Sequence, residues 1–303
     1  MTKDEIVEEI KRLKKKRNAV ILVHNYQIPE VQDIADFLGD SLDLSRKAAT
    51  TKADVIVFCG VNFMAETAKI LSPEKTVLLP SEFAGCPLAD MITLDKLNRL
   101  KKQYPSAAVV TYVNSTAIIK ANSDICCTSA NAVDVVQSLQ QNEVIFVPDR
   151  NLGHYVSTQL NSKRIILNNG YCPTHIWITK DDILNMKSFH PEAKVIVHPE
   201  CNPEVVEIAD EVLSTGGMVR FAKNTDVKEI IVATEMGIIY RLKKENPKKE
   251  FYPASPKAVC SNMKLTNLEN VMWSLQELKY EIEIPKEIIE KAKISLEKMI
   301  KTL

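Results

Sequence analysis

Short apolar runs alternate with amphipathic stretches along the whole chain. Residues 19–23 and 55–58 are rich in valine and isoleucine, which is typical of strands buried in a parallel sheet. Stretches such as 42–50 and 62–71 place apolar residues at helical spacing. This alternation predicts an α/β fold, in which right-handed crossovers join parallel strands and helices cover both faces of each sheet.

The same order of elements is expected three times. The expected strands are 19–23, 55–58, 76–79, 108–111, 125–127, 144–147, 164–167, 194–197, 229–233 and 251–252. The expected helices are 4–16, 29–38, 42–50, 62–71, 93–103, 130–140, 152–160, 179–189, 204–209 and 237–244, with one more opened by 214–216. Two further helices are expected near the carboxyl terminus, the first opened by the capping-box sequence Thr266–Glu269.

Four kinds of position recur at one spacing. They are His24, Tyr112 and His198 after the first strands, Ser41, Ser129 and Thr215 before the second helices, Thr93, Thr179 and Thr266 before the helices that open a new pass, and Cys86, Cys172 and Cys260 after the last strands. Within each kind, successive copies lie 86 to 88 residues apart. A shared spacing of this length predicts three homologous βαβαβα units, each a three-layer αβα domain.

We expect the domains at 1–90, 91–177 and 178–265, with the first completed by helices from 266–303. Ligands of open α/β sheets bind beyond the carboxyl ends of the strands, and all the recurring polar positions lie there. Pseudo-threefold symmetry would bring these positions together in one central active site.

Composition narrows the functional class. The chain has 303 residues, 39 of them basic and 39 acidic, so its formal net charge is zero. This balance gives no reason to expect a nucleic-acid or membrane partner. No apolar run approaches a membrane-spanning length and the amino terminus is charged, so we expect a cytoplasmic protein. The seven cysteines, an odd number, are not typical of a disulfide framework.

The residue types at the recurring positions suggest a chemistry. Three thiolates can complete a zinc site with a histidine, or hold a [4Fe–4S] cluster that leaves one iron open. An open iron is a Lewis acid and suits dehydration. The hydroxyl positions at the starts of helices are suited to carboxylate or phosphate. The groups suited to proton transfer and hydrogen bonding are His24, Tyr26, Tyr112, His198 and Glu200.

Eight segments, in order, carry a family resemblance that covers nearly the whole chain. They are Val23–Gln27, Gly39–Leu42, Gly60–Ala68, Thr111–Asn114, Cys127–Ser129, His198–Cys201, Ser214–Gly216 and Cys260–Lys264. This set resembles the quinolinate synthase (quinolinate synthetase A) family. The resemblance implies condensation of iminoaspartate with dihydroxyacetone phosphate to quinolinate, with loss of phosphate and water, in de novo NAD biosynthesis. It also implies a [4Fe–4S] cluster with one open iron, and a functional link to the enzyme that produces iminoaspartate.

The resemblance also implies roles for single residues. Cys86, Cys172 and Cys260 would hold the cluster, and the segment Cys260–Met263 offers only one thiol where some relatives carry three. Tyr26 and Glu200 would be the acid–base pair, assisted by the two histidines of the substrate site. That site would comprise His24, Ser41, Tyr112, Val113, Asn114, Ser129, His198, Pro199, Glu200 and Thr215, with Val113 and Pro199 acting chiefly through backbone.

Two other classes stay open. The first is another [4Fe–4S]-dependent hydro-lyase that acts on a small anionic substrate. The second is a non-catalytic metal- or nucleotide-binding protein, although the eight glycines form neither a dinucleotide nor a P-loop fingerprint. The remaining residues of reactive type lack partners at the repeat spacing. We expect Cys59, Cys126 and Cys127 to be inert packing residues, His154, His175 and His190 to be structural or solvent-exposed, and leave Cys201 and Lys223 as open candidates.

Overall fold

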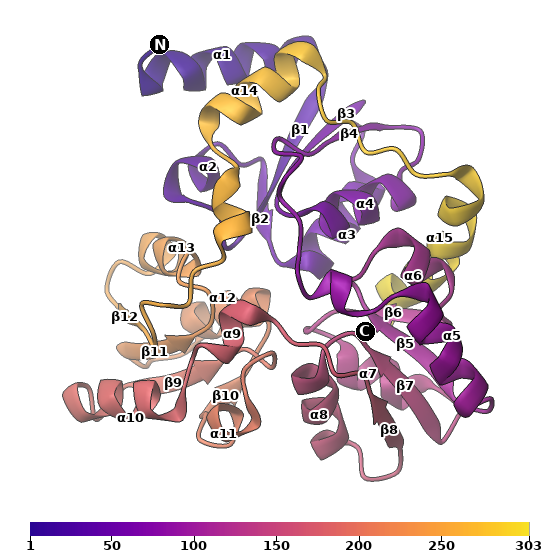
Figure 1. Cartoon of the computed structure of the whole chain (residues 1–303). Helices are drawn as coiled ribbons and strands as arrows, with labels where there is room; N and C mark the ends of the chain where they lie inside the picture. Colours follow the sequence, from indigo (N-terminus) through magenta and orange to yellow (C-terminus); the bar gives the residue numbers. More distant parts are fainter. Residues whose placement is uncertain (303) are drawn as a thin grey trace.

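Three four-stranded parallel sheets form the framework of the structure, a computed structural model that describes residues 1–302 (Figure 1). The first sheet has the order β2-β1-β3-β4, with β1 Ala19–His24, β2 Phe37–Gly39, β3 Val55–Cys59 and β4 Thr76–Leu78. The second has the order β6-β5-β7-β8, with β5 Ala108–Tyr112, β6 Ile125–Cys127, β7 Glu143–Val147 and β8 Arg164–Leu167. The third has the order β10-β9-β11-β12, with β9 Lys194–Val197, β10 Glu211–Val212, β11 Glu229–Ala233 and β12 Glu250–Pro253. One topology repeated three times confirms the predicted fold class.

The helices alternate with the strands. In the first unit they are α1 Lys3–Lys16, α2 Pro29–Asp33, α3 Ser41–Thr50 and α4 Asn62–Leu71. The second unit has α5 Leu94–Gln103, α6 Ala117–Ala121, α7 Ala132–Ser138, α8 Arg150–Gln159 and α9 Pro173–Ile176. The third has α10 Lys180–Phe189, α11 Pro203–Val206, α12 Thr215–Asn224 and α13 Ile238–Glu245, followed by α14 Leu268–Glu277 and α15 Lys286–Lys301. Two 3-10 turns, Ala89–Met91 and Ser261–Leu265, complete the set of named helices in the described chain.

The edge strands account for the main difference from the sequence prediction. The helix expected at 29–38 ends at Asp33, because Phe37–Gly39 pairs with β1 through Leu22–Phe37 and His24–Gly39. Edge strand β10 has only two residues. Segments this short show no periodicity, so the sequence pattern does not predict β10. The four-residue helix α9 is not predicted for the same reason.

An aspartate holds the start of the second strand to the first in every unit. The Asp36 carboxylate accepts the Ile21 amide at 2.8 Å, Asp124 accepts Val109 at 2.7 Å, and Asp210 accepts Val195 at 2.8 Å. The backbone amide of each aspartate donates back to the carbonyl of the same strand residue. These aspartates share the spacing of the other repeated positions, so the three units repeat the same hydrogen bonds as well as the same residue types.

Side-chain caps set the beginnings of the helices that open the later units. Thr93 accepts the Lys96 amide at 3.2 Å and Thr179 accepts the Asp182 amide at 3.1 Å. The third capping residue is Asn267, which accepts the Asn270 amide at 2.8 Å. The prediction that Thr266 opens this helix is wrong by one residue.

The carboxyl-terminal helices tie the units together. Helix α14 packs on α1 and β3, and Arg17 donates to the carbonyls of Leu275 and Gln276 at 3.2 and 2.8 Å. Helix α15 lies against α4 of the first unit and against α6 and β6 of the second, on the right of Figure 1. The largest hydrophobic cluster contains buried residues from all three sheets, including Leu22, Phe146 and Ile196. The units therefore share one core around their common centre.

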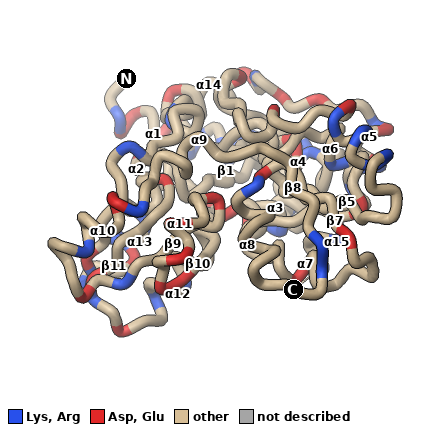
Figure 2. The backbone as a smooth tube through the Cα atoms, turned by 60° about the horizontal axis from the view of Figure 1, so that its bottom comes forward, with Lys and Arg blue, Asp and Glu red and all other residues tan. Residues whose placement is uncertain are grey.

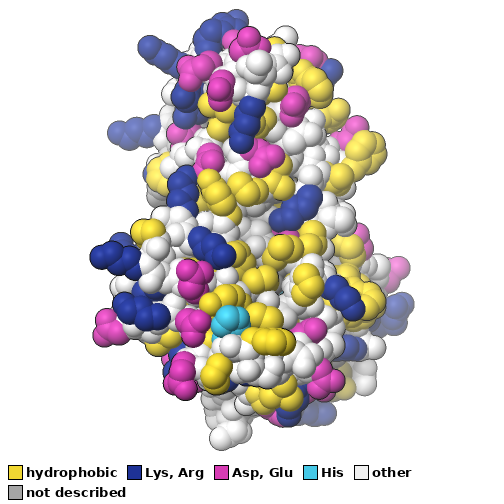
Figure 3. Space-filling model, turned by 90° about the vertical axis from the view of Figure 1, so that its left-hand side faces the viewer, with side chains coloured by type: hydrophobic (Ala, Val, Ile, Leu, Met, Phe, Trp, Pro, Cys, Tyr) yellow, Lys and Arg dark blue, Asp and Glu magenta, His cyan; other side chains and the backbone are white. Residues whose placement is uncertain are grey.

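Charged side chains are spread over the surface. Figure 2 shows basic and acidic residues interspersed along the helices and loops of all three units. The face in Figure 3 likewise mixes basic, acidic and apolar side chains. Within residues 1–302, no helix has both the length and the apolar composition needed to cross a bilayer.

The aspartate clamps generate a stability prediction. Replacing Asp124 by alanine leaves the Val109 amide without its 2.7 Å acceptor. We expect this change to lower the free energy of unfolding by about 1–3 kcal/mol, the usual cost of leaving a buried donor without a partner, since Val109 is fully buried. Urea titration followed by circular dichroism measures it. The control is Asp134→Ala at an exposed position of α7, where the carboxylate makes no such contact, and an equal loss in both variants would contradict the clamp.

Candidate active site

One cavity of about 280 Å³ lies where the three sheets meet, and all three units contribute to its wall. Twelve of the fourteen predicted site residues line it: His24, Tyr26, Ser41, Cys86, Tyr112, Asn114, Ser129, Cys172, His198, Glu200, Thr215 and Cys260. Val113 and Pro199 are buried but are not part of the wall. The Val113 amide donates to the Cys127 carbonyl at 2.9 Å, so it is already used within the sheet.

Three partly exposed cysteines face this cavity, one from each unit. The other four, Cys59, Cys126, Cys127 and Cys201, are fully buried and lie outside its wall. Cys172 and Cys260 each precede a short helix, α9 and the 3-10 turn Ser261–Leu265. The Asn262 side-chain amide donates to the Gly85 carbonyl at 2.8 Å, which joins the loops of Cys86 and Cys260.

Burial keeps the three thiols protonated in the absence of a metal. It raises the pKa of Cys86 to about 12, and it also raises the pKa values of Cys172 and Cys260. Metal binding displaces the thiol protons, because the cation stabilises the thiolates directly. Three soft donors around one cavity, with the other thiols outside its wall, fit a metal centre held by three cysteines.

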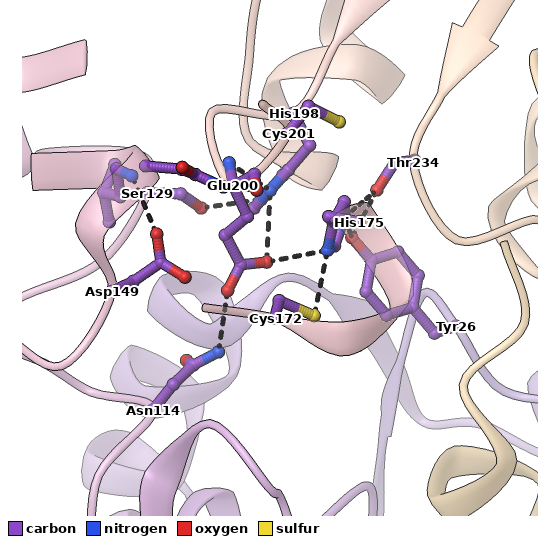
Figure 4. A network of polar contacts seen from close by, with 12 residues as sticks. Tyr26, Asn114, Ser129, Asp149, Cys172, His175, His198, Glu200, Cys201 and Thr234 are labelled. Atoms are coloured by element: carbon purple, nitrogen blue, oxygen red, sulfur yellow. Dashed lines mark hydrogen bonds and ion pairs between the residues drawn. The ribbon is translucent and has the colours of Figure 1, made fainter. Parts of the chain in front are cut away.

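Glu200 is the hub of the polar network in the cavity (Figure 4). Its Oε2 lies 3.1 Å from His175 Nδ1 and 3.2 Å from His198 Nδ1, and its Oε1 accepts a hydrogen bond from the Asn114 side-chain amide at 3.3 Å. Burial tends to raise the pKa of Glu200, but His175 and the hydrogen bonds from His198 and Tyr112 lower it below the usual value. Glu200 is therefore a buried, ionised carboxylate whose oxygens lie within hydrogen-bonding distance of protein side chains instead of water.

A second buried carboxyl group lies beside it. Burial, and then the charge of Glu200, raises the pKa of Asp149 well above its usual value. Asp149 Oδ1 accepts the Leu152 amide at 2.8 Å, whereas Oδ2 has no partner. Environments that push two pKa values apart assign the charge to Glu200 and the proton to Asp149.

A chain of hydrogen bonds connects Tyr26 to Glu200. The Tyr26 hydroxyl lies 2.5 Å from Thr234 Oγ1, which lies 2.8 Å from His175 Nε2, and His175 Nδ1 reaches Glu200 (Figure 4). Burial lowers the pKa of His175 to about 3 and raises that of Tyr26 well above its usual value. Phenol and neutral imidazole can therefore pass a proton along this chain.

Tyr26, Asn114 and Glu200 occupy the same position in the three units, two residues beyond His24, Tyr112 and His198. The Tyr26 backbone amide donates to His24 Nδ1 at 3.2 Å, so neutral His24 carries its proton on Nε2. Burial lowers the pKa of His24 to about 4, which keeps it neutral near pH 7. One backbone geometry thus presents three different side chains to the cavity.

The helix starts at the cavity are capped by neighbours of the predicted hydroxyls. Asp40 Oδ1 accepts two amides of α3, and Asp40 Oδ2 accepts the Ser214 hydroxyl at 2.9 Å and the Gly216 amide at 3.2 Å. Ser41 and Thr215 are the first residues of α3 and α12 and are not their caps. Their hydroxyls are thereby left to the cavity, although the Thr215 hydroxyl oxygen also accepts a hydrogen bond from the Asn25 side-chain amide at 2.9 Å.

An ion pair joins the third cysteine loop to Tyr26. Buried Glu235 lies 2.8 Å from Lys264 Nζ and accepts the Cys260 amide at 3.2 Å. Lys264 also donates to the Tyr26 carbonyl. The Gly237 Cα faces this junction so closely that a Cβ would lie 2.6 Å from the Tyr26 carbonyl oxygen. The position of Cys260 is thus coupled to that of the candidate acid.

His175 is the main residue that the sequence prediction missed. We expected it to be structural or solvent-exposed, but it is buried and contacts Cys172, Glu200 and Thr234. The only signal available was its place three residues after Cys172 on α9, a helix too short to predict. His154 is exposed, His190 stacks on Tyr252, and Lys223 is exposed outside the cavity wall.

Three repeated α/β units that jointly enclose a thiol- and imidazole-lined cavity define a class of α/β proteins with one shared central site. A family model described as quinolinate synthetase A protein matches residues 8–301. A quinolinate synthase of Dehalococcoides mccartyi (strain ATCC BAA-2266 / KCTC 15142 / 195) is 57% identical over 296 residues, covering 98% of both chains. Others from Thermodesulfovibrio yellowstonii and Methanosarcina barkeri are 55% and 54% identical, covering 97% and 99% of this chain and 97% and 98% of their own. The chain belongs to the quinolinate synthetase A family of enzymes.

The buried histidines generate a pH prediction. The folded-state pKa of His24, about 4, lies below the ordinary value of 6.5, so the unfolded chain binds an extra proton between these two pH values. The contribution of His24 to stability is present above pH 6.5 and is lost as the pH falls towards 4, by up to about 1.4 kcal/mol per pH unit. Thermal melts of metal-free protein across this range should show a shallower loss for His24→Gln than for the parent. Exposed His154→Gln should follow the parent curve, and parallel curves for all three proteins would contradict the assignment.

Proposed function

We propose that this chain is a quinolinate synthase of de novo NAD biosynthesis, which condenses iminoaspartate with dihydroxyacetone phosphate and releases phosphate and water. The observation that carries the proposal is the convergence of twelve of the family's expected site residues on one cavity. The relatives that match over almost the whole chain bear the name of this activity. The iminoaspartate-producing enzyme is its proposed functional partner.

The proposed cofactor is a [4Fe–4S] cluster held by Cys86, Cys172 and Cys260. These three thiols are the donors that the cavity presents, and no fourth cysteine lines its wall. When bound, such a cluster would supply a Lewis-acidic iron with an open coordination position. A zinc site completed by a histidine uses different donors and is distinguished by colour and sulfide content.

The proposed substrate site combines hydroxyls, imidazoles and an amide. Ser41, Ser129 and Thr215 offer hydroxyl groups at or near helix starts to the carboxylates and phosphate of the substrates. Ser129 Oγ lies 3.2 Å from His198 Nε2, which orients both groups. Neutral His24 and Asn114 supply further donors without adding a buried charge.

The proposed proton transfers use the chain from Tyr26 to Glu200. Tyr26 acts as an acid, since its raised pKa keeps the phenol protonated. Thr234 and His175 return a proton to it through contacts of 2.5 and 2.8 Å. Glu200 acts as the base, since its lowered pKa keeps it ionised. Acid and base are thus linked by one relay.

The activity test uses protein purified without oxygen. Incubation with iminoaspartate, generated in place, and dihydroxyacetone phosphate should yield quinolinate, measured by chromatography. Iron-containing brown protein that forms no product would reject the synthase and favour the alternative, a cluster-dependent hydro-lyase with another small anionic substrate. Omission of either substrate is the control.

The cysteine assignment predicts which cysteine variants lose the cluster. Cys86→Ser, Cys172→Ser and Cys260→Ser should each lose the visible absorbance of the cluster and all turnover, because each removes one of three ligands. Cys201→Ser is the matched control, since this buried thiol lies outside the cavity wall and contacts the Ala233 carbonyl. Iron and sulfide analysis provides the measurement. A normal cluster in Cys172→Ser would refute the ligand set.

The relay predicts that Thr234→Val retains the cluster but lowers kcat by about 10²-fold or more, the usual range for lost proton transfer. Valine keeps the shape of threonine and removes the hydroxyl between Tyr26 and His175. Tyr26→Phe should show the same pattern. Stopped-flow and steady-state kinetics at matched cluster content test this, and an unchanged kcat in both variants would exclude the relay.

A further inference from the structure

A second set of three metal-ligating atoms lies inside the cavity. Cys172 Sγ, His175 Nδ1 and Glu200 Oε2 all lie within 4.8 Å of one another (Figure 4). The imidazole nitrogen is 3.1 Å from the sulfur and 3.1 Å from the carboxylate oxygen. In a tetrahedral zinc site the bond lengths place such atoms about 3.3–3.6 Å apart, so the two distances from the imidazole nitrogen need to change by only a few tenths of an ångström.

The surroundings of these atoms suit a zinc ligand set. If the proton of His175 moves to Nε2, that nitrogen donates to Thr234 Oγ1 at 2.8 Å and Nδ1 is free to bind the metal. A hydrogen bond of this kind from the other ring nitrogen supports most metal-binding histidines. His175 and Glu200 are only 1% and 3% exposed, so neither needs to be drawn in from solvent.

We infer that the metal-free chain binds one zinc ion through Cys172, His175 and Glu200. Binding converts the Cys172 thiol to a thiolate and releases one proton, and the fourth position is left to water or another small ligand. Cys172 belongs both to this zinc site and to the proposed cluster ligands. His175 and Glu200 belong to the zinc site alone. Zinc and cluster therefore compete for one sulfur.

Because of this competition, bound zinc would inhibit assembly of the cluster. This part of the inference rests on the proposed function. A zinc ion in this site withholds Cys172 and also occupies the relay residue His175 and the base Glu200. The chain would then be closed to both cluster assembly and catalysis until the zinc is removed. The zinc site itself depends only on the observed side chains.

Zinc binding is tested on metal-free, reduced full-length chain with Zn²⁺ and a chromophoric competing chelator. We expect one tight equivalent in the parent protein. His175→Ala and Glu200→Gln should each weaken binding at least about tenfold, because each removes a ligand. Cys86→Ser and Cys260→Ser, which lack only cluster ligands, should bind as the parent does.

Two results would overturn the inference. One is binding that is unchanged in His175→Ala, and the other is a loss in Cys86→Ser or Cys260→Ser as large as that in His175→Ala. Cobalt substitution provides a second reading that does not depend on affinity. A tetrahedral Co²⁺ spectrum with a thiolate-to-metal band should persist in Cys86→Ser and vanish in Cys172→Ser, and its persistence in Cys172→Ser would reject the site.

The competition is tested by reconstituting the cluster from iron and sulfide. Zinc-loaded parent protein should form no cluster until a chelator removes the zinc, whereas zinc should not block reconstitution of His175→Ala. Cluster formation to the same extent in zinc-loaded and zinc-free parent protein would overturn the competition. If the zinc-free parent forms no cluster, the proposed function fails while the zinc titration still stands or falls by itself.

Discussion

The buried charge of Glu200 is the constraint on which the site depends. A carboxylate at 3% exposure is stable only if donors surround it, and here they come from the second and third units. His175, His198 and Asn114 all lie within hydrogen-bonding distance, and this orients the imidazole of His175 towards Thr234 and Tyr26. The first unit enters the network only through Tyr26. No unit could therefore form this site alone, and α14 and α15, which hold the units together, support it indirectly.

Much of the fold was accessible from the sequence because the repeat multiplies weak signals. One apolar run or one cysteine predicts little, but positions that keep a common spacing three times support each other. The centre strands of the sheets were predicted because they are fully buried runs of β-branched residues. The edge strands Phe37–Gly39 and Glu211–Val212 were missed since their pairing, not their composition, makes them strands.

The residues of the site also fall into those that the repeat predicts and those that it does not. Residues in the repeat register, such as Cys86 and Ser129, line the cavity because topology fixes where the carboxyl ends of strands meet. Asp149 and Glu235 keep the repeat spacing, 86 residues apart, but only as a pair and not in all three units. His175 and Thr234 have no counterpart of the same residue type at that spacing and act through contacts between units. Such contacts depend on how the units are rotated against one another, which no local pattern encodes. The cluster ligands and substrate contacts stay predictions that the cavity supports by proximity.

The equivalent positions of Tyr26, Asn114 and Glu200 carry a consequence for the origin of the site. An assembly of three identical subunits would have to place the same residue at all three positions, because one codon would specify them together. It could offer three phenols or three carboxylates around its axis, but not one of each. Joining the copies in a single polypeptide releases each codon to mutate independently. Symmetry then builds the enclosure, and its loss at one position per copy places a phenol, an amide and a carboxylate around the same cavity.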